Sequence, residues 1–197
     1  MASQVQIVNL AYGKFGGLTI QSITEATPQG RAAAVLWDNV RDELIANYPW
    51  KFALKRATLD TPDASTPEFE YDYKYTLPAD CLKVWDIYNT KSNYVVEGGV
   101  LLCSDETIYL KYGAKITDVS LYPPPFVASM ATKLSAELCA KRSDNKQLRT
   151  ALLQEFEITI SHAYKLDAIE GRQTLPDGEK DLSQGIYSWQ KAGHYGY

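Results

Sequence analysis

The chain has 197 residues, of which 45% are hydrophobic and 22% are charged, and its formal net charge is −4. This length fits one globular domain, or one domain with an insertion, and can bury a core without a metal or a disulfide. The negative charge argues against a nucleic-acid clamp, because such proteins normally carry a basic patch.

No apolar run approaches the roughly 20 residues needed to span a bilayer, so we expect no membrane segment. The N-terminal residues have no basic region followed by an uninterrupted apolar stretch, and are therefore not a secretory signal. The widely spaced Cys81, Cys103 and Cys139 are expected to be reduced, in a protein made in the cytoplasm. The 14 tyrosines against 5 phenylalanines fit surfaces that contact other proteins, and they fit half-exposed strands as well.

A first helix is predicted from Ser3, a candidate N-cap, to the pair Gly16-Gly17, which would end it. Its apolar face is expected to consist of Val5, Ile7, Val8, Ala11, Tyr12 and Phe15.

A second helix is predicted from Thr27, its N-cap, through Pro28 at the first helical position, to Tyr48 before Pro49. Its apolar stripe is Ala33, Leu36, Trp37, Val40, Leu44 and Tyr48. The polar residues Arg31, Asp38, Arg41 and Asp42 are expected mostly on the opposite, solvated face.

The period then changes from that of a helix to that of strands, between Trp50 and about Thr117. The segment "WKFALKRATL" predicts a strand that starts at Trp50, and "FEYDYKYTL" predicts one from Phe69 to Leu77 with one solvated face. "LKVWDIYN" predicts a third strand, and Gly98-Gly99 a hairpin turn. Because Trp50 and Phe52 stand where the chain leaves the helices, they are predicted to fill the joint between the helical and β parts.

After Pro123 to Pro125, a third helix is predicted from Phe126 to about Arg142, and a fourth from about Leu148 to Ile169. The remaining residues, 172–197, have no sustained period but are too rich in aromatics for a disordered tail. We interpret them as an extended arm that becomes ordered on a partner. The arm residues expected to bind this partner or a neighbouring copy are Leu182, Ile186, Tyr187, Trp189, Tyr195 and Tyr197.

The expected fold class is therefore α+β. Residues 1–49 and 121–171 would form a four-helix bundle, residues 50–120 a small inserted antiparallel β-domain, and residues 172–197 the C-terminal arm.

Catalytic motifs are absent from the sequence. It contains no HExxH, no Cys/His cluster, no phosphate-binding glycine loop and no GxSxG elbow, so we expect no catalytic, cofactor-binding or metal-binding residues. His162, beside the fourth apolar stripe, is interpreted as structural. Two alternatives stay open: a cell-wall hydrolase using a carboxylate pair such as Asp72 and Glu97, and a DNA-binding module using the basic clusters "KFALKR" and "CAKRSDNK".

Three blocks of sequence carry a resemblance to a known family. They are "RDELIANYPWKFALKRATL", then "YKYTLPADCLKVWDIYN", then "IYLKYGAKITDVSLYPPPFVASMATKLSAELCAKRSDN". In this order they resemble the tail tubular protein A family, the head-to-tail connector adaptors of short-tailed phages, over about residues 2 to 170.

The resemblance implies a non-enzymatic virion protein located at the head-to-tail interface of the phage tail. As in that family, about 12 copies would form a ring that binds the portal protein above and the tail nozzle protein below. DNA would pass through the lumen during genome ejection without specific binding, and a net negative charge is compatible with that passage.

Overall fold

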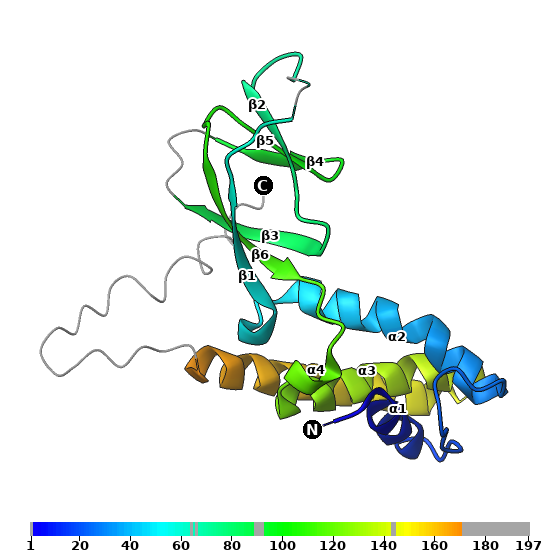
Figure 1. Cartoon of the computed structure of the whole chain (residues 1–197). Helices are drawn as coiled ribbons and strands as arrows, with labels where there is room; N and C mark the ends of the chain where they lie inside the picture. The colour runs from blue at the N-terminus through cyan, green and yellow to red at the C-terminus, as the bar shows by residue number, and fades with distance from the viewer. Residues whose placement is uncertain (1, 64, 66, 89–92, 143–144, 171–197) are drawn as a thin grey trace, which may run out of the picture.

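The computed structural model describes residues 2–63, 65, 67–88, 93–142 and 145–170. In this part of the chain the fold is mixed α+β, with four α-helices and two small antiparallel sheets (Figure 1). The helices are α1 (Gln4–Gly13), α2 (Pro28–Asn47), α3 (Pro124–Arg142) and α4 (Lys146–Glu170). The strands are β1 (Leu54–Leu59), β2 (Tyr73–Thr76), β3 (Cys81–Tyr88), β4 (Val95–Glu97), β5 (Val100–Cys103) and β6 (Ile108–Ala114).

Side-chain caps set the starts of the first two helices, as the sequence predicts. Ser3 forms a capping box with Gln6 at the start of α1. The Thr27 hydroxyl accepts a hydrogen bond of 3.1 Å from the Gly30 amide at the start of α2. The helix α2 ends at Asn47, two residues before Pro49, whereas α1 ends at Gly13, earlier than the predicted stop at Gly16-Gly17.

The helix α3 packs against α1, α2 and α4, and these helices run together along the base of the molecule (Figure 1). Its buried residues include Phe126, Met130, Leu134 and Leu138, which is the stripe that the sequence predicts. The strands rise above α2, which contacts β3 and β6.

The strands form two sheets of three, with the orders β1-β6-β3 and β2-β5-β4. The predicted hairpin is confirmed, because β4 and β5 pair across Gly98 and Gly99, whose φ angles of 56° and 83° suit a two-residue turn. Buried residues of both sheets, such as Tyr75 and Leu110, belong to the same hydrophobic cluster as Trp37 and Phe126 of the helices. The helical and β parts therefore share one continuous core.

Two predicted strands begin later than expected. The segment Lys51–Ala53 is a 3₁₀ turn, and β1 begins only at Leu54, because Trp50 turns into the core. In the second case only Tyr73–Thr76 is a strand. Its partner β5 has four residues, so nothing pairs with residues 69–72, and Phe69 lies on the surface.

Two polar residues also differ from the expectations. Arg41 is buried rather than solvated, and His162 is exposed on α4 rather than packed as a structural histidine. The three cysteines are free, as expected, and Cys103 and Cys139 are buried.

Candidate functional site

The structure places Trp50 and Phe52 in a cluster of aromatic rings where α2, α3, α4 and the start of β1 meet. We call this cluster the aromatic joint; it consists of Tyr48, Trp50, Phe52, Tyr122, Phe126 and Tyr164. The side chain of Trp50 is only 1% exposed. Its ring meets the Phe126 ring edge-on, with centroids 5.0 Å apart, and Phe52 meets the same ring at 4.8 Å. Such edge-to-face pairs add to the free energy gained by burial.

Hydrogen bonds fix the orientation of the aromatic joint. The Trp50 indole Nε1 donates to the Leu44 carbonyl oxygen at 2.8 Å, so the ring is tied to the last turns of α2. The Tyr48 hydroxyl donates to the Tyr164 carbonyl oxygen at 3.2 Å, and the two rings stack. The chain therefore leaves α2 in one fixed direction.

Asp167 of α4 completes this corner. Its Oδ1 accepts a 3.1 Å hydrogen bond from the Lys51 amide, the first residue of the 3₁₀ turn, while its buried Oδ2 has no partner among the described residues. Burial raises the pKa of Asp167, although the hydrogen bond from Lys51 opposes that rise. Asp167 was not among the predicted site residues, yet it lies four residues after Ala163 and seven after Ile160, on the same helical face, and this spacing could have revealed it.

A second polar cluster joins three distant parts of the chain at Asp80. Its carboxylate accepts hydrogen bonds from Lys55 Nζ at 2.6 Å and from the Tyr112 hydroxyl at 3.1 Å. The bond from Lys55 is the main cause of a lowered Asp80 pKa. Burial, helped by the bond to Asp80, raises the pKa of Tyr112 to about 12, so the phenol remains a donor at neutral pH.

The buried Arg41 belongs to a network of ion pairs that reaches from α2 to the segment that follows β6. Its guanidinium forms ion pairs of 2.7 Å with Asp38 and with Asp42, and Asp42 also pairs with Lys115 at 3.2 Å. The position of Arg41, four residues after the buried Trp37, is the sequence signal for its burial. This network and the aromatic joint both lie where the chain passes between the helices and the strands.

The arm residues predicted to bind a partner lie outside the described residues. They are Leu182, Ile186, Tyr187, Trp189, Tyr195 and Tyr197.

The geometry does not favour the proposed carboxylate pair. Asp72 immediately precedes β2. Glu97 of β4 pairs with Val100 of β5, and Val100 in turn pairs with Thr76, at the opposite end of β2 from Asp72. Four residues of strand, about 13 Å, separate the two positions. The carboxylates of glycosidases stand about 5 to 9.5 Å apart. Both side chains are also exposed, and neither lines the hollow beside Arg56 or the hollow beside Lys14.

The described part of the chain has neither a metal-binding cluster nor a membrane-spanning helix. Its residues include no group of three or more His, Cys, Asp or Glu side chains placed to hold a metal ion. None of its helices combines the length and apolar character needed to cross a bilayer.

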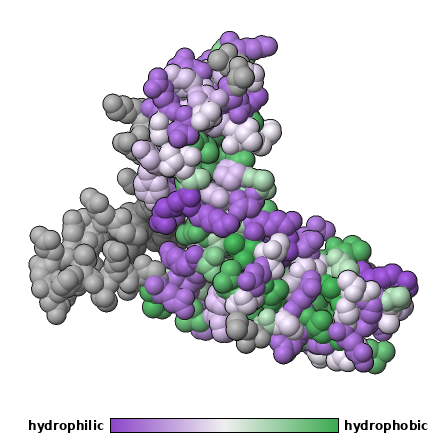
Figure 2. Space-filling view, viewed as in Figure 1, coloured by the Kyte–Doolittle hydropathy of each residue, from purple (hydrophilic) through white to green (hydrophobic). Residues whose placement is uncertain are grey.

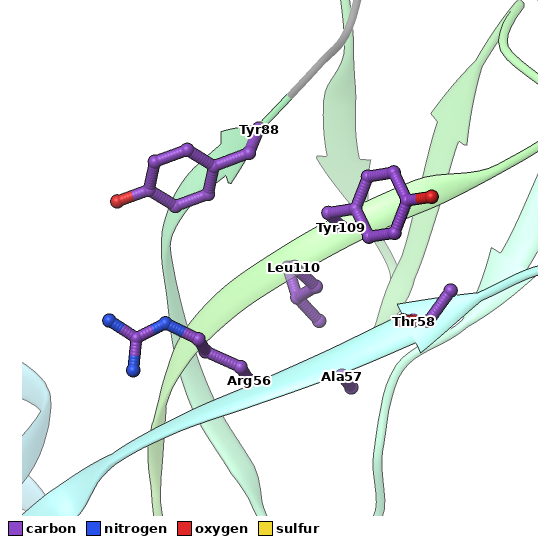
Figure 3. A pocket seen from close by; sticks show the side chains of 6 residues that line it. All are labelled: Arg56, Ala57, Thr58, Tyr88, Tyr109 and Leu110. Atoms are coloured by element: carbon purple, nitrogen blue, oxygen red, sulfur yellow. The ribbon is translucent and has the colours of Figure 1, made fainter.

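A hollow of about 470 Å³ opens on the outer side of the sheet β1-β6-β3. We call it the tyrosine hollow; it is lined by Arg56, Ala57, Thr58, Tyr88, Tyr109 and Leu110. Tyr109 faces Thr58 on one side and Tyr88 on the other, so the two tyrosines are cross-strand neighbours. Figure 3 shows the two rings and the Arg56 guanidinium around the opening, with Leu110 between them. The sequence holds no local signal for this site, because only the pairing of β3 with β6 brings its two tyrosines together.

No protein-family model matches this chain, and neither does any curated protein.

Proposed function

We propose that this protein is a structural adaptor of a tailed phage, a ring-forming component between the portal and the tail nozzle. In this proposal about 12 copies surround the channel through which DNA leaves the head. The four helices act as one bundle in each subunit, and residues 172–197 form the arm that grips the portal or a neighbouring copy.

The observation that carries the proposal is the meeting of the three sequence blocks at one cluster. Lys55 belongs to the first block, Asp80 to the second and Tyr112 to the third, and the carboxylate of Asp80 bonds to both of the others. These blocks lie far apart in the sequence and carry the resemblance to the adaptor family. Their convergence supports the view that the three blocks form one structural unit rather than three chance matches.

The rigid connection between the two parts also supports the proposal. A closed ring requires each subunit to present two different faces to its neighbours in a fixed relative orientation. The aromatic joint and the Arg41 network favour this fixed relation. Trp50 packs on Phe126 just before β1 begins, and Lys115, which follows β6, pairs with Asp42 of α2. The separation of Asp72 from Glu97 gives the hydrolase alternative no support.

The test is electron microscopy of the purified protein mixed with the portal protein of the same phage, together with the native mass of each mixture. We expect rings that stack on the portal, and no rings of the same kind from the portal alone. Failure to form a ring with the portal at every salt concentration tried would contradict the adaptor function.

A further inference from the structure

An exposed aromatic side chain stands at the far end of the β part. Phe69 is 74% exposed and lies between Glu68 and Glu70, which are exposed as well. Glu70 has a φ of 70°, and the Tyr71 amide donates to the Phe69 carbonyl oxygen at 2.9 Å across it. A three-residue turn with positive φ at a non-glycine residue is strained, and such strain concentrates at functional positions.

Acidic residues surround Phe69. We call this surface the acidic tip; its exposed members are Glu68, Glu70, Asp72 and Glu106. The Asp72 amide donates to Ser104 Oγ at 3.3 Å, and the Tyr73 hydroxyl donates to Glu106 at 3.2 Å. These bonds hold the two acidic segments together. Hydrophilic residues cover most of this end of the molecule in Figure 2.

The tyrosine hollow, in contrast to the acidic tip, combines exposed aromatic rings with basic side chains. Tyr88 and Tyr109 are 47% and 44% exposed around an opening of about 470 Å³, although large aromatic side chains are normally covered. Arg56 of β1 faces Lys111 of β6 on one side, and Asp86 of β3 faces Lys111 on the other. Lys83 of β3 faces Gly113, two residues further along β6. Within the described part of the chain, Arg56, Lys83 and Lys111 form no ion pair.

We propose that the acidic tip of one copy docks on the tyrosine hollow of the next, with Phe69 as the anchor between Tyr88 and Tyr109. Aromatic anchors in aromatic pockets are frequent centres of binding free energy, and complementary charge around them fixes the orientation. The acids on either side of Phe69 then face Arg56 and Lys111. The exposure of Phe69 shows that it does not fill the hollow of its own chain.

This contact is heterologous, because the tip and the hollow are different surfaces of one chain. Repetition of such a contact closes into a ring when the rotation per subunit permits it. The inference rests on the proposed ring and names the contact by which its copies join.

Sedimentation velocity of the full chain at low salt, over a range of concentrations, tests the contact. We expect wild-type association to weaken as salt is added, since the screening length falls to about 10 Å at 0.1 M. Phe69→Ala should weaken association at least about tenfold, as loss of an anchor does. Ile158→Ala is the matched control, because Ile158 on α4 is 73% exposed and should leave association unchanged.

Charge exchange gives the sharper test. Arg56→Glu with Lys111→Glu, or Glu68→Lys with Glu70→Lys, should each weaken association at least about tenfold. All four changes in one chain should restore it to within about threefold of wild type, because the pairing is then reversed on both sides. Arg149→Glu with Lys165→Glu changes the net charge as much as the first pair, at exposed positions on α4, and should have no effect.

Three results would overturn this contact. They are a wild-type chain that stays monomeric at low salt, variants that associate like wild type, and a four-residue exchange that fails to restore association although each pair weakens it. A labelled single-stranded oligonucleotide tests the other occupant. If it binds the wild-type chain but not the Arg56→Glu, Lys111→Glu variant, while self-association persists in that variant, the hollow binds nucleic acid instead. None of these results removes the adaptor function, because rings formed on the portal test that separately.

Discussion

At the scale of single residues, Trp50 contributes most to the aromatic joint. Its side chain is buried and contacts rings from α3 and α4, and its indole N–H donates a hydrogen bond to the Leu44 carbonyl oxygen. Loss of the ring leaves a cavity and an unpaired carbonyl group at the point where the helical and β parts join.

We therefore expect Trp50→Ala to lower the free energy of unfolding by about 3 to 5 kcal/mol, measured by urea denaturation. Phe69→Ala removes an exposed aromatic ring and should change that free energy by less than about 0.5 kcal/mol. A Trp50→Ala protein as stable as the Phe69→Ala protein would contradict the role of the aromatic joint in holding the two parts together.

Two aspartates of the same region should respond to pH in opposite directions. The pKa of Asp167 is raised in the folded protein, so its contribution to stability is complete below the unfolded value, about 3.9, and is lost as pH rises through the folded pKa. The pKa of Asp80 is lowered, so its contribution is present above the unfolded value and is lost as pH falls through the folded pKa.

Asp167→Asn and Asp80→Asn test this difference. Relative to wild type, the unfolding free energy of Asp167→Asn should increase as pH rises from acid to neutral, and that of Asp80→Asn should decrease. Urea denaturation at several pH values measures both. Parallel trends for the two variants would show that burial does not dominate at Asp167.

At the scale of elements, the packing of β3 on β6 depends on a missing side chain. A Cβ atom at Gly113 of β6 would lie 2.8 Å from Trp85 Nε1 and 3.8 Å from the Ile45 carbonyl oxygen of α2. Trp85 thus lies against bare backbone beside α2. Its indole nitrogen is buried, with no hydrogen-bond partner in the described part of the structure.

We expect Gly113→Ala to displace the Trp85 ring and to cost about 1 to 3 kcal/mol in unfolding free energy. Gly13→Ala is the control, because nothing lies within 4 Å of a Cβ atom there, and it should be neutral or slightly stabilising. In a Trp85→Leu background the cost of Gly113→Ala should shrink. An equal cost with and without Trp85 would mean that the strain lies in the backbone.

At the scale of the whole molecule, the helices and sheets share one hydrophobic core. The aromatic joint, the Arg41 network and the Asp80 cluster add ring contacts, ion pairs and hydrogen bonds to it. The proposed ring would use this rigid body and bring in the arm only when a partner is met. A change in the arm should therefore affect assembly of the ring without affecting the folding of one subunit.

A chain that ends at residue 171 should keep the thermal melting temperature of the full chain within a few degrees, because the core of the described residues remains complete. The same chain should no longer form rings on the portal. Circular dichroism and electron microscopy measure the two properties. If rings still form on the portal without residues 172–197, the arm is not the segment that binds the portal or a neighbouring copy.

The sequence alone determined the helices well, because their caps and apolar stripes are local signals. Thr27, Pro28 and Pro49 indicate the limits of α2, and the glycine pair at 98 and 99 indicates the turn between β4 and β5. The α+β class and the change of period near residue 50 follow from the same local patterns.

Only the tertiary structure decided what each element faces. The alternation from Phe69 to Leu77 is a strand pattern throughout, yet the four residues of β5 allow pairing only along Tyr73–Thr76, and this leaves Phe69 exposed. Burial of Arg41 and Asp167 and the meeting of Tyr88 with Tyr109 likewise depend on neighbours distant in sequence. A residue's own segment sets its conformation, but burial and charge environment are set by the surfaces packed against it, which no local pattern contains.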